Sequence, residues 1–530
     1  MTLRIGRIKS NTTSMIALLG ITFVPALATA GEVTLKSSDG TVNITGEFIE
    51  FTDNNYIIET PSGPVRVTGR QVNCEGASCP EFTLTDVDIR LAGADVLAQG
   101  LAPLLLEGFA GAREAKATAT VVSGSGESVF AVVDEDGFGA ELANYLVSPT
   151  SSGGAFQSLA SKSIDIGMST RRISPSEAEE LGQTGAGDMF DPAQEHIVAL
   201  DSLVMIVHPD NPVSELSYQQ LGGIYGGFIK NWAEVGGNDA PITLVERDAG
   251  AGTRTELAST LAGRILDQVP PIQPGAVVGA NNGTISQIVS NDPNAIGYVG
   301  NFFVRGNKGL ALINECGRRQ TPDAFSVRTE EYALHRFLYL YTRADVTAQP
   351  LADLIDYAVS DEAGAVISKA GFIDLGIDRR QQSLDSERAK ILVDRDIEEY
   401  DAENSLAMLS ELENYDRLSA TFRFETGSRQ LTPRGLLNIE VLTEYLEDQP
   451  EGTKVKLVGF ADSVGNIANN TVLSRGRAER VLETLQDFAE DRLSGIELTA
   501  TGYGEAAPVG CNISDNGRRL NRRVEVWIEN

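Results

Sequence analysis

The stretch ITLVERDAGAGTRTELA, residues 242–258, contains the pattern that decides the fold of the larger part of the chain. An apolar segment ends at Arg247, a glycine-rich turn follows, and a helical pattern begins at Thr253. Backbone N–H groups at the start of such a helix, together with the helix dipole, point at the turn. This order predicts an anion-binding corner to which Arg247 and Arg254 add positive charge; a tight turn without a ligand is the alternative.

The same alternation of strand and helix patterns extends over residues 86–375 and is typical of an α/β domain with largely parallel sheets. The strand candidates are TATVV, SIDIGM, SLVMIV, ITLVE and AIGYVG. The helix candidates cover residues 97–110, 155–162, 253–267, 284–290 and 350–369.

Different patterns flank this domain. Residues 31–85 alternate apolar and polar positions between Gly, Asp and Asn breaks, which predicts a small antiparallel β module. Residues 376–417 predict an acidic helical linker, either extended over about 45–50 Å or folded back on a neighbour. Residues 418–530 predict a βαβαβ arrangement with one added strand. The expected fold class is therefore α/β multidomain.

The first 30 residues predict export. A basic start, an apolar run from Met15 to about Leu27 and the A-x-A motif at Ala28–Ala30 form a signal-peptide pattern. No other apolar stretch of about 18 residues follows. We therefore expect a soluble mature protein beyond the cytoplasmic membrane.

The net charge and the cysteine and histidine content limit the partners, disulfides and metal sites that the chain can have. The formal net charge of -31 argues against nucleic acid and anionic membrane surfaces as partners. Cys74 and Cys79 lie in the turn-rich NCEGASC and predict a local disulfide, whereas Cys316 and Cys511 either pair across a domain boundary or stay free. Three histidines and the absence of CxxC spacing give no metal site, and we expect no cofactor.

The C-terminal motifs are FRFETGSRQLTP (422–433), GFADSVGNIANNTVLSRGRAERV (459–481), GYGEAAP (502–508) and NGRRLNRRVEV (516–526). Together they resemble the OmpA-like peptidoglycan-binding domain. The resemblance implies that Asp462 and Arg477 hold the diaminopimelate residue of the peptidoglycan stem peptide. The chemistry fits, because a zwitterionic group needs an acceptor for its ammonium and a donor fork for its carboxylate.

Amide and backbone groups form the rim of the predicted peptidoglycan site. They come from Asn470, near the start of the following helix, and from the loop at Gly465. Glu425 stands where many relatives have aspartate, and Gly476 stands where another charged residue is usual. An ordinary surface salt bridge between Asp462 and Arg477 is the alternative.

The central segments 151–174, 199–232, 242–258 and 292–300 resemble, in order, the phosphate-transporter type of periplasmic substrate-binding protein, which is PstS-like. The resemblance implies a two-lobed type II periplasmic-binding-protein fold that closes over an oxyanion, and an ABC-transporter permease as a further partner. The oxyanion-binding residues it implies are Ser151, Ser152, Gly153, Thr170, Arg171, Arg247, Gly250, Gly252, Thr253 and Arg254.

Departures from that family leave the ligand open. Thr170 stands where the high-affinity family has an aspartate that accepts the proton of phosphate, and Ala251 replaces a serine of the glycine turn. Asp95 and Val96 stand where a threonine hydroxyl is expected, and a carboxylate there would repel an anion. Loss of the proton acceptor would relax discrimination against sulfate. The alternatives are phosphate or a close relative, another anion, and lobes retained for protein contact.

Catalysis is not expected. No Ser-His-Asp order, nucleophile elbow or HExxH motif is present, and GAGT lacks the lysine that follows in a P-loop. We therefore expect a binding protein, periplasmic and attached to the cell wall or outer membrane after cleavage near Ala30. A structural envelope protein with a degenerate binding domain is the alternative.

Overall fold

The computed structural model divides into two compact units, Met1–Phe82 and Thr83–Asn530, each described by itself. It describes residues 31–36, 43–52, 55–68, 72–76, 78–79, 87–121, 126–134, 141–248, 251–264, 271–382, 389 and 402–530. The predicted signal peptide lies outside these residues. No helix among them is long and apolar enough to cross a membrane. The finer boundaries at residues 85, 375 and 417 stay predictions from the sequence.

The first unit is an antiparallel five-stranded sheet in the order β4-β3-β2-β1-β5. Its strands are β1 (Glu32–Lys36), β2 (Asn43–Thr52), β3 (Asn55–Thr60), β4 (Gly63–Thr68) and β5 (Asn73–Glu75). Alternation places Val33 and Leu35 of β1 on the buried face. Cys74 and Cys79 form a disulfide, as the turn-rich sequence predicts.

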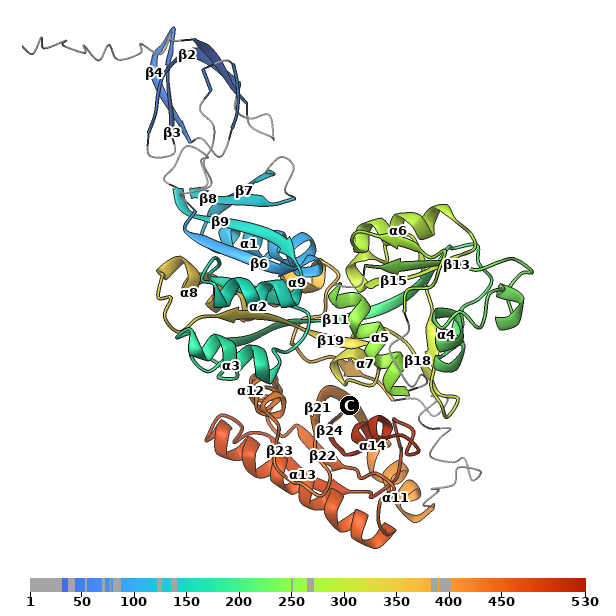
Figure 1. Cartoon of the computed structure of the whole chain (residues 1–530). Helices are drawn as coiled ribbons and strands as arrows, with labels where there is room; N and C mark the ends of the chain where they lie inside the picture. Colours follow the sequence, from blue (N-terminus) through green and yellow to red (C-terminus); the bar gives the residue numbers. More distant parts are fainter. Residues whose placement is uncertain are drawn as a thin grey trace, which may run out of the picture. The chain divides into compact units, whose positions relative to one another are not determined.

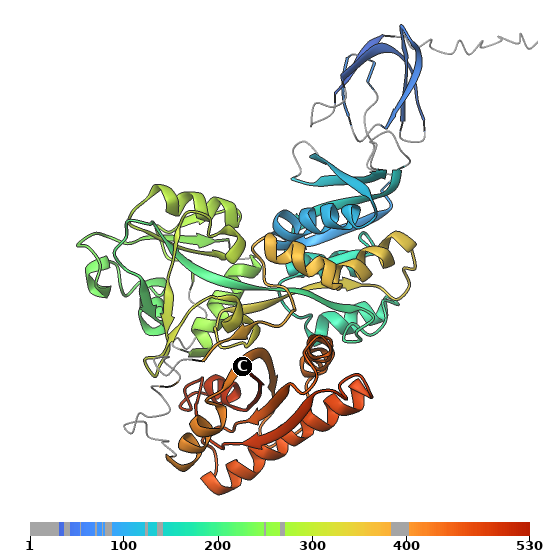
Figure 2. The same cartoon turned by 180° about the vertical axis from the view of Figure 1, so that it is seen from behind.

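The second unit contains an eleven-stranded mixed sheet that runs through two lobes (Figures 1 and 2). Its path is β14-β13-β15-β11-β19-β10-β6-β9-β8-β7, with β16 paired to β11. β11 (Glu195–Val207) leads from the first lobe into the second, and β19 (His335–Thr342) leads back. The chain thus crosses between the lobes twice, on two neighbouring antiparallel strands.

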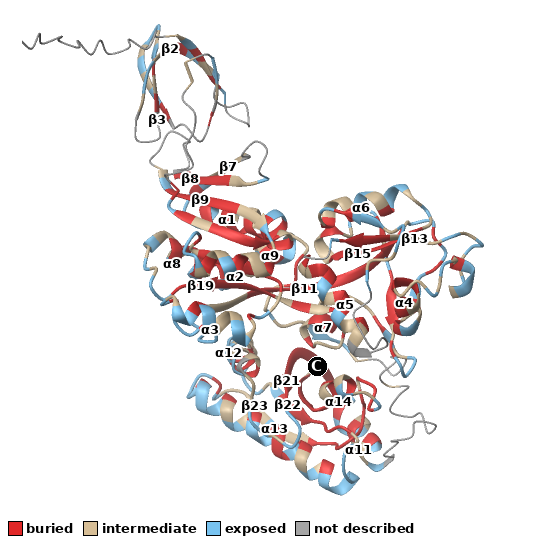
Figure 3. Cartoon of the chain, in the orientation of Figure 1, coloured by how far each residue is buried: buried red, intermediate tan, exposed pale blue. Residues whose placement is uncertain are grey.

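Helices cover both faces of the sheet in each lobe, and the central strands are buried along most of their length (Figure 3). The first-lobe elements are β6 (Ile89–Ala94), the π-helix η3 (Val96–Leu101), α1 (Ala102–Gly111), β7 (Ala115–Val121), β8 (Ser128–Asp134), β9 (Glu141–Thr150), α2 (Ser152–Ala160), β10 (Ile166–Ser169), α3 (Pro175–Gln183), α8 (Gln349–Ala358) and α9 (Asp361–Lys369). The second-lobe elements are β12 (Glu215–Ser217), α4 (Tyr218–Tyr225), η4 (Trp232–Val235), β13 (Thr243–Arg247), α5 (Gly252–Arg264), β14 (Val277–Gly279), α6 (Asn282–Asn291), β15 (Ala295–Gly300), η5 (Asn301–Phe303), β16 (Lys308–Gly309), β17 (Ala311–Ile313), β18 (Arg319–Gln320) and α7 (Ala324–Arg328).

The segment 350–369 forms two helices where the sequence predicts one. α8 ends at Ala358, and Ser360 begins α9 by accepting a hydrogen bond from the Ala363 backbone N–H at 3.4 Å. A serine side chain that satisfies an N-terminal amide favours a new helix start. Because the apolar positions of α8 and α9 follow a similar helical period, the sequence pattern predicts one continuous helix.

The C-terminal region has its own sheet, in the order β20-β21-β24-β22-β23. Its elements are β20 (Arg379–Arg380), α11 (Ala402–Leu412), β21 (Tyr415–Arg423), α12 (Pro433–Glu447), β22 (Lys454–Gly459), α13 (Ile467–Ala489), β23 (Glu497–Gly502), α14 (Asp515–Asn521) and β24 (Arg523–Glu529). Met408 and Leu412 of α11 pack in one cluster with Val458 and Trp527, so the described end of the predicted linker helix folds back on this region. Residues 383–388 and 390–401 of that linker lie outside the described residues.

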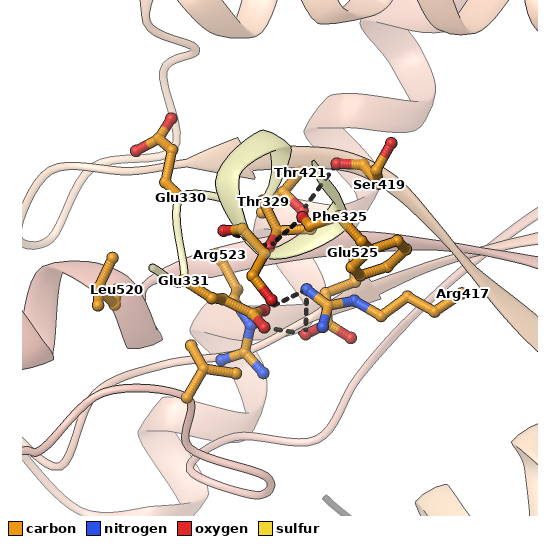
Figure 4. Close-up of polar contacts among 12 residues, drawn as sticks. Phe325, Thr329, Glu330, Glu331, Arg417, Ser419, Thr421, Leu520, Arg523 and Glu525 are labelled. Atoms are coloured by element: carbon orange, nitrogen blue, oxygen red, sulfur yellow. Dashed lines mark hydrogen bonds and ion pairs between the residues drawn. The ribbon is translucent and has the colours of Figure 1, made fainter. Parts of the chain in front are cut away.

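The second lobe is bonded to the C-terminal region. A disulfide joins Cys316 to Cys511, which settles a pairing that the sequence leaves open. Buried Arg417 lies 2.5 Å from Glu331 and 3.2 Å from Glu525 (Figure 4). Arg423 donates to the carbonyl oxygens of Thr329 and Leu520. The turn Thr329–Glu331, directly after α7, is therefore held by arginines from β21.

Replacement of Glu331 tests this contact. Glu331→Gln should lower the free energy of unfolding by about 1–3 kcal/mol, because it removes one of two carboxylates that balance the buried Arg417 guanidinium. Glu215→Gln is the control, since Glu215 forms an exposed pair with Arg319 whose loss should cost about 0–1 kcal/mol. Denaturant titrations of both full-length variants measure the difference, and equal stabilities would contradict the prediction.

Candidate functional site

The first-lobe half of the candidate anion site lies where parallel strands end. β6 pairs in parallel with both β9 and β10, so their carboxyl ends meet at one edge of the sheet. Ser151 caps α2 by accepting from the Gly154 N–H at 3.0 Å. The Ser152 hydroxyl accepts from the Thr170 N–H at 3.1 Å, and both residues are buried.

The second-lobe half is the start of α5. A Cβ atom built on Gly252 would lie 3.1 Å from the Thr170 hydroxyl and 3.6 Å from the Ser152 hydroxyl. The two lobes therefore approach closely here, and glycine leaves the space. The Thr253 hydroxyl lies 3.4 Å from the donating Nη1 of Arg336. Gly250 of the predicted site lies outside the described residues.

Arg247 is the cation of this site. Only 4% of the residue is exposed, and its Nη2 donates to the Ala280 carbonyl at 3.3 Å. Nη1 lies 3.2 Å from Oδ2 of Asp95, but Nε and Nη1 have no hydrogen-bond partner among the described residues. Asp95 also accepts from Nδ2 of Asn282 at 3.1 Å. The guanidinium thus keeps donors that a bound oxyanion can use.

Two predicted arginines have other partners. Arg171 forms a two-pronged pair with Glu177 at 2.6 and 2.8 Å, and its Nη2 lies 3.9 Å from a Cβ atom built on Gly153. Burial raises the pKa of Glu177, but hydrogen bonds from Arg171 and Ser174 outweigh it and lower the pKa to about 2. Arg254 lies 3.7 Å from Glu246, which faces the other side of β13 from Arg247.

Asp95, which the sequence analysis places near the site, and three residues that the sequence prediction does not include complete this region. Asp95 and Asn282 contact the site directly, and Asp201 and Arg336 form a buried pair on β11 and β19. A charged residue inside each of the apolar runs ALDSLVMIV and LHRFLYLY is the signal that could have found the last two. The Asn-Asn-Gly helix start is the signal for Asn282.

The candidate peptidoglycan site lies at the end of β22. Oδ2 of Asp462 accepts from Nη1 of Arg522 at 2.7 Å, so Arg522, and not Arg477, forms its ion pair in the structure. Arg477 is fully buried and donates to three carbonyls, those of Ser428 at 3.1 Å, Phe460 at 3.3 Å and Glu425 at 3.3 Å. Burial lowers the pKa of Arg477 to about 10, with the charge of Asp462 acting in the opposite direction.

The predicted rim residues lie beside Asp462. Nδ2 of Asn470 donates to the Asp462 and Val464 carbonyls at 3.1 and 3.2 Å. Gly465 has φ of 116°, a conformation that favours glycine. Loop residues 464–466 and the first residues of α13, 467–469, are exposed. Asp462, Asn470 and Arg522 therefore meet next to an accessible loop.

Comparisons with known proteins match the two regions for which the motifs suggest a family. Residues 84–362 match the model of the PBP superfamily domain, and residues 423–522 match that of the OmpA family. The Bacillus subtilis phosphate-binding protein PstS is 30% identical over 206 residues, which cover 37% of this chain and 65% of that protein. Outer membrane porin F of Pseudomonas fluorescens is 34% identical over 113 residues, which cover 21% of this chain and 33% of that protein.

One similar solved structure is that of the ABC-type phosphate transport receptor from Vibrio cholerae, which is 23% identical in sequence and superposes with a TM-score of 0.39. The matched region covers 54% of this chain and 99% of the receptor chain. The chain spans a little under two thirds of the PstS proteins of B. subtilis and Borreliella burgdorferi. Both resemblances inferred from the motifs are confirmed. Because the first family model matches more than half of its length, the chain belongs to the PBP superfamily, and an OmpA family domain follows at residues 423–522.

Proposed function

We propose that the protein binds phosphate or a related oxyanion between its two lobes and attaches to peptidoglycan through its C-terminal domain. The observation that carries the first half is the buried Arg247, whose Nε and Nη1 form no hydrogen bond with any described residue, although Nη1 lies 3.2 Å from the Asp95 carboxylate. A buried charge with unused donors is costly, and an oxyanion would satisfy it. The N-termini of α2 and α5 would add backbone donors at the same place.

The Asp95 carboxylate would select among oxyanions by their protonation state. Its carboxylate lies 3.2 Å from Arg247, so it would repel a fully ionised anion in the same space. An anion that still carries a proton can instead donate a hydrogen bond to Asp95. The proposed ligand is therefore hydrogen phosphate or a close relative rather than sulfate. Asp95 would thus oppose the loss of discrimination that the sequence suggests at Thr170.

Calorimetric titration of the full-length protein with phosphate tests oxyanion binding. Arg247→Gln should weaken binding at least 100-fold, because the charge-assisted donors are lost. The matched control is Arg319→Gln, which removes an exposed arginine of the second lobe. Absence of heat from folded wild-type protein would contradict the proposal.

The Asp95 carboxylate gives a separate test. Asp95→Asn should lower the ratio of phosphate to sulfate affinity by about 10-fold, since one hydrogen bond to a charged group contributes about 1.5–3 kcal/mol. Competition titrations with the two anions measure the ratio. An unchanged ratio would mean that Asp95 does not contact the bound anion.

The second half of the proposal concerns the cell wall. Asp462, Arg522 and Asn470 combine a carboxylate acceptor, a guanidinium donor and an amide, the groups that a zwitterionic diaminopimelate end requires. Arg477 supports this arrangement through hydrogen bonds to backbone carbonyls. Because it binds three backbone carbonyls, Arg477→Ala would also release the turn Glu425–Ser428, and loss of binding would not identify a ligand contact.

Asp462→Asn is the sharper variant. Its co-sedimentation with purified diaminopimelate-type peptidoglycan should require at least 10-fold more peptidoglycan, because the amide has lost the charge that holds an ammonium group. Asp515→Asn serves as the control, since Asp515 is an exposed carboxylate of the same domain. Equal sedimentation of both variants would remove Asp462 from the site.

A structural envelope protein is the second candidate. The ion pair between Asp95 and Arg247 favours it, because a partly neutralised arginine can persist in lobes that bind no anion. Both candidates place a non-catalytic protein in the periplasm at the cell wall or outer membrane. Only the first candidate function, oxyanion binding, includes delivery of the anion to an ABC-transporter permease.

A further inference from the structure

Gly476 lies in the middle of α13, where glycine is less favourable than alanine. The space beside it is occupied by Arg429. A Cβ atom built on Gly476 would lie 2.5 Å from Cζ, 2.6 Å from Nη1 and 2.9 Å from Nε of Arg429. The absence of a side chain at position 476 therefore lets the Arg429 guanidinium lie against the helix.

Arg429 reaches this place from the loop between β21 and α12. The Ser428 N–H donates to the Glu425 carbonyl at 3.0 Å, and Gly427 has φ of 70°. Arg477 donates to the carbonyls of the same two residues, Ser428 at 3.1 Å and Glu425 at 3.3 Å. The arginine next to Gly476 on the helix thus fixes the turn that positions Arg429.

The three arginines of this region differ in how available they are. Arg477 is fully buried, and Arg522 is paired with Asp462. Arg429 is exposed, and no hydrogen bond or ion pair joins it to any described residue. The charges of Arg522 and Arg429 both add to the effect of burial in lowering the pKa of Arg477. Arg429 is therefore the available donor fork of this region.

We propose that Arg429 is a ligand-binding residue of the peptidoglycan site and binds a carboxylate of the stem peptide. It supplies from a loop the charge that Gly476 does not supply from α13. A guanidinium can hold a carboxylate through two parallel hydrogen bonds, which a lysine at the same place cannot do. This inference rests on the proposed attachment of the domain to peptidoglycan.

The experiment compares full-length variants by co-sedimentation with diaminopimelate-type peptidoglycan and by calorimetry with the soluble L-Ala-γ-D-Glu-diaminopimelate tripeptide. Arg429→Gln should weaken binding about 10-fold and make it less sensitive to salt, whereas Arg429→Lys should retain part of the affinity. Arg480→Gln is the matched control, because Arg480 is an exposed arginine of α13. It should bind like wild type.

A double variant separates ligand contact from loop structure. In Arg429→Gln with Gly476→Lys the cation moves from the loop to the helix, so affinity and salt dependence should recover in part. No recovery, with a salt dependence like that of wild type, would assign Arg429 a structural role and overturn the proposal. Wild-type affinity in Arg429→Gln, with binding lost in Asp462→Asn, would overturn it and leave the site standing. No binding by wild type would instead contradict the proposed function.

Discussion

The buried ion pair between Asp201 and Arg336 joins the two strands that connect the lobes on either side of the candidate anion site. The two residues lie opposite each other on β11 and β19, the strands that join the lobes, with Nε and Nη2 of Arg336 2.9 and 2.5 Å from Oδ2 of Asp201. Asp201 also accepts from the Asn301 N–H, and Arg336 donates to the hydroxyl of Thr253 at the start of α5. A Cβ atom on Gly300 would lie 2.6 Å from Asp201, so glycine is required there. Such a pair adds little net stability after desolvation, but it can fix the register of the two strands.

Burial alone does not distinguish a supporting arginine from a binding one. Arg477 and Arg247 are both buried next to strand ends, but every nitrogen of Arg477 donates to a backbone carbonyl, whereas two nitrogens of Arg247 have no hydrogen-bond acceptor among the described residues. The first arrangement holds a turn in place without a ligand. The second leaves unused donors that a ligand could satisfy. The two arginines therefore differ in how many of their donors are satisfied by the chain itself.

The sequence predicts the helices and turns whose formation depends on a local pattern of residues. Helix Pro433–Glu447 has the bounds that its proline start and periodicity indicate, and the glycine corner before Thr253 begins α5 as expected. The partners of charged groups depend on residues far apart in the chain. Asp462 pairs with Arg522, 60 positions away, and Asp95 meets Arg247 of the other lobe. No periodicity encodes such pairs, and several arginines follow Asp462 at plausible distances.

One short helix lies between the second lobe and the candidate peptidoglycan site. Arg519 of α14 lies 3.5 Å from Glu330 of the second lobe, and Arg522, directly after α14, pairs with Asp462 of the candidate peptidoglycan site. The disulfide at Cys511 fixes the chain a few residues before the same helix. A displacement of the second lobe that moves α14 would therefore reach Arg522 within three residues. Because the lobe and α14 are joined in this way, the C-terminal domain in isolation lacks two of the contacts that hold α14.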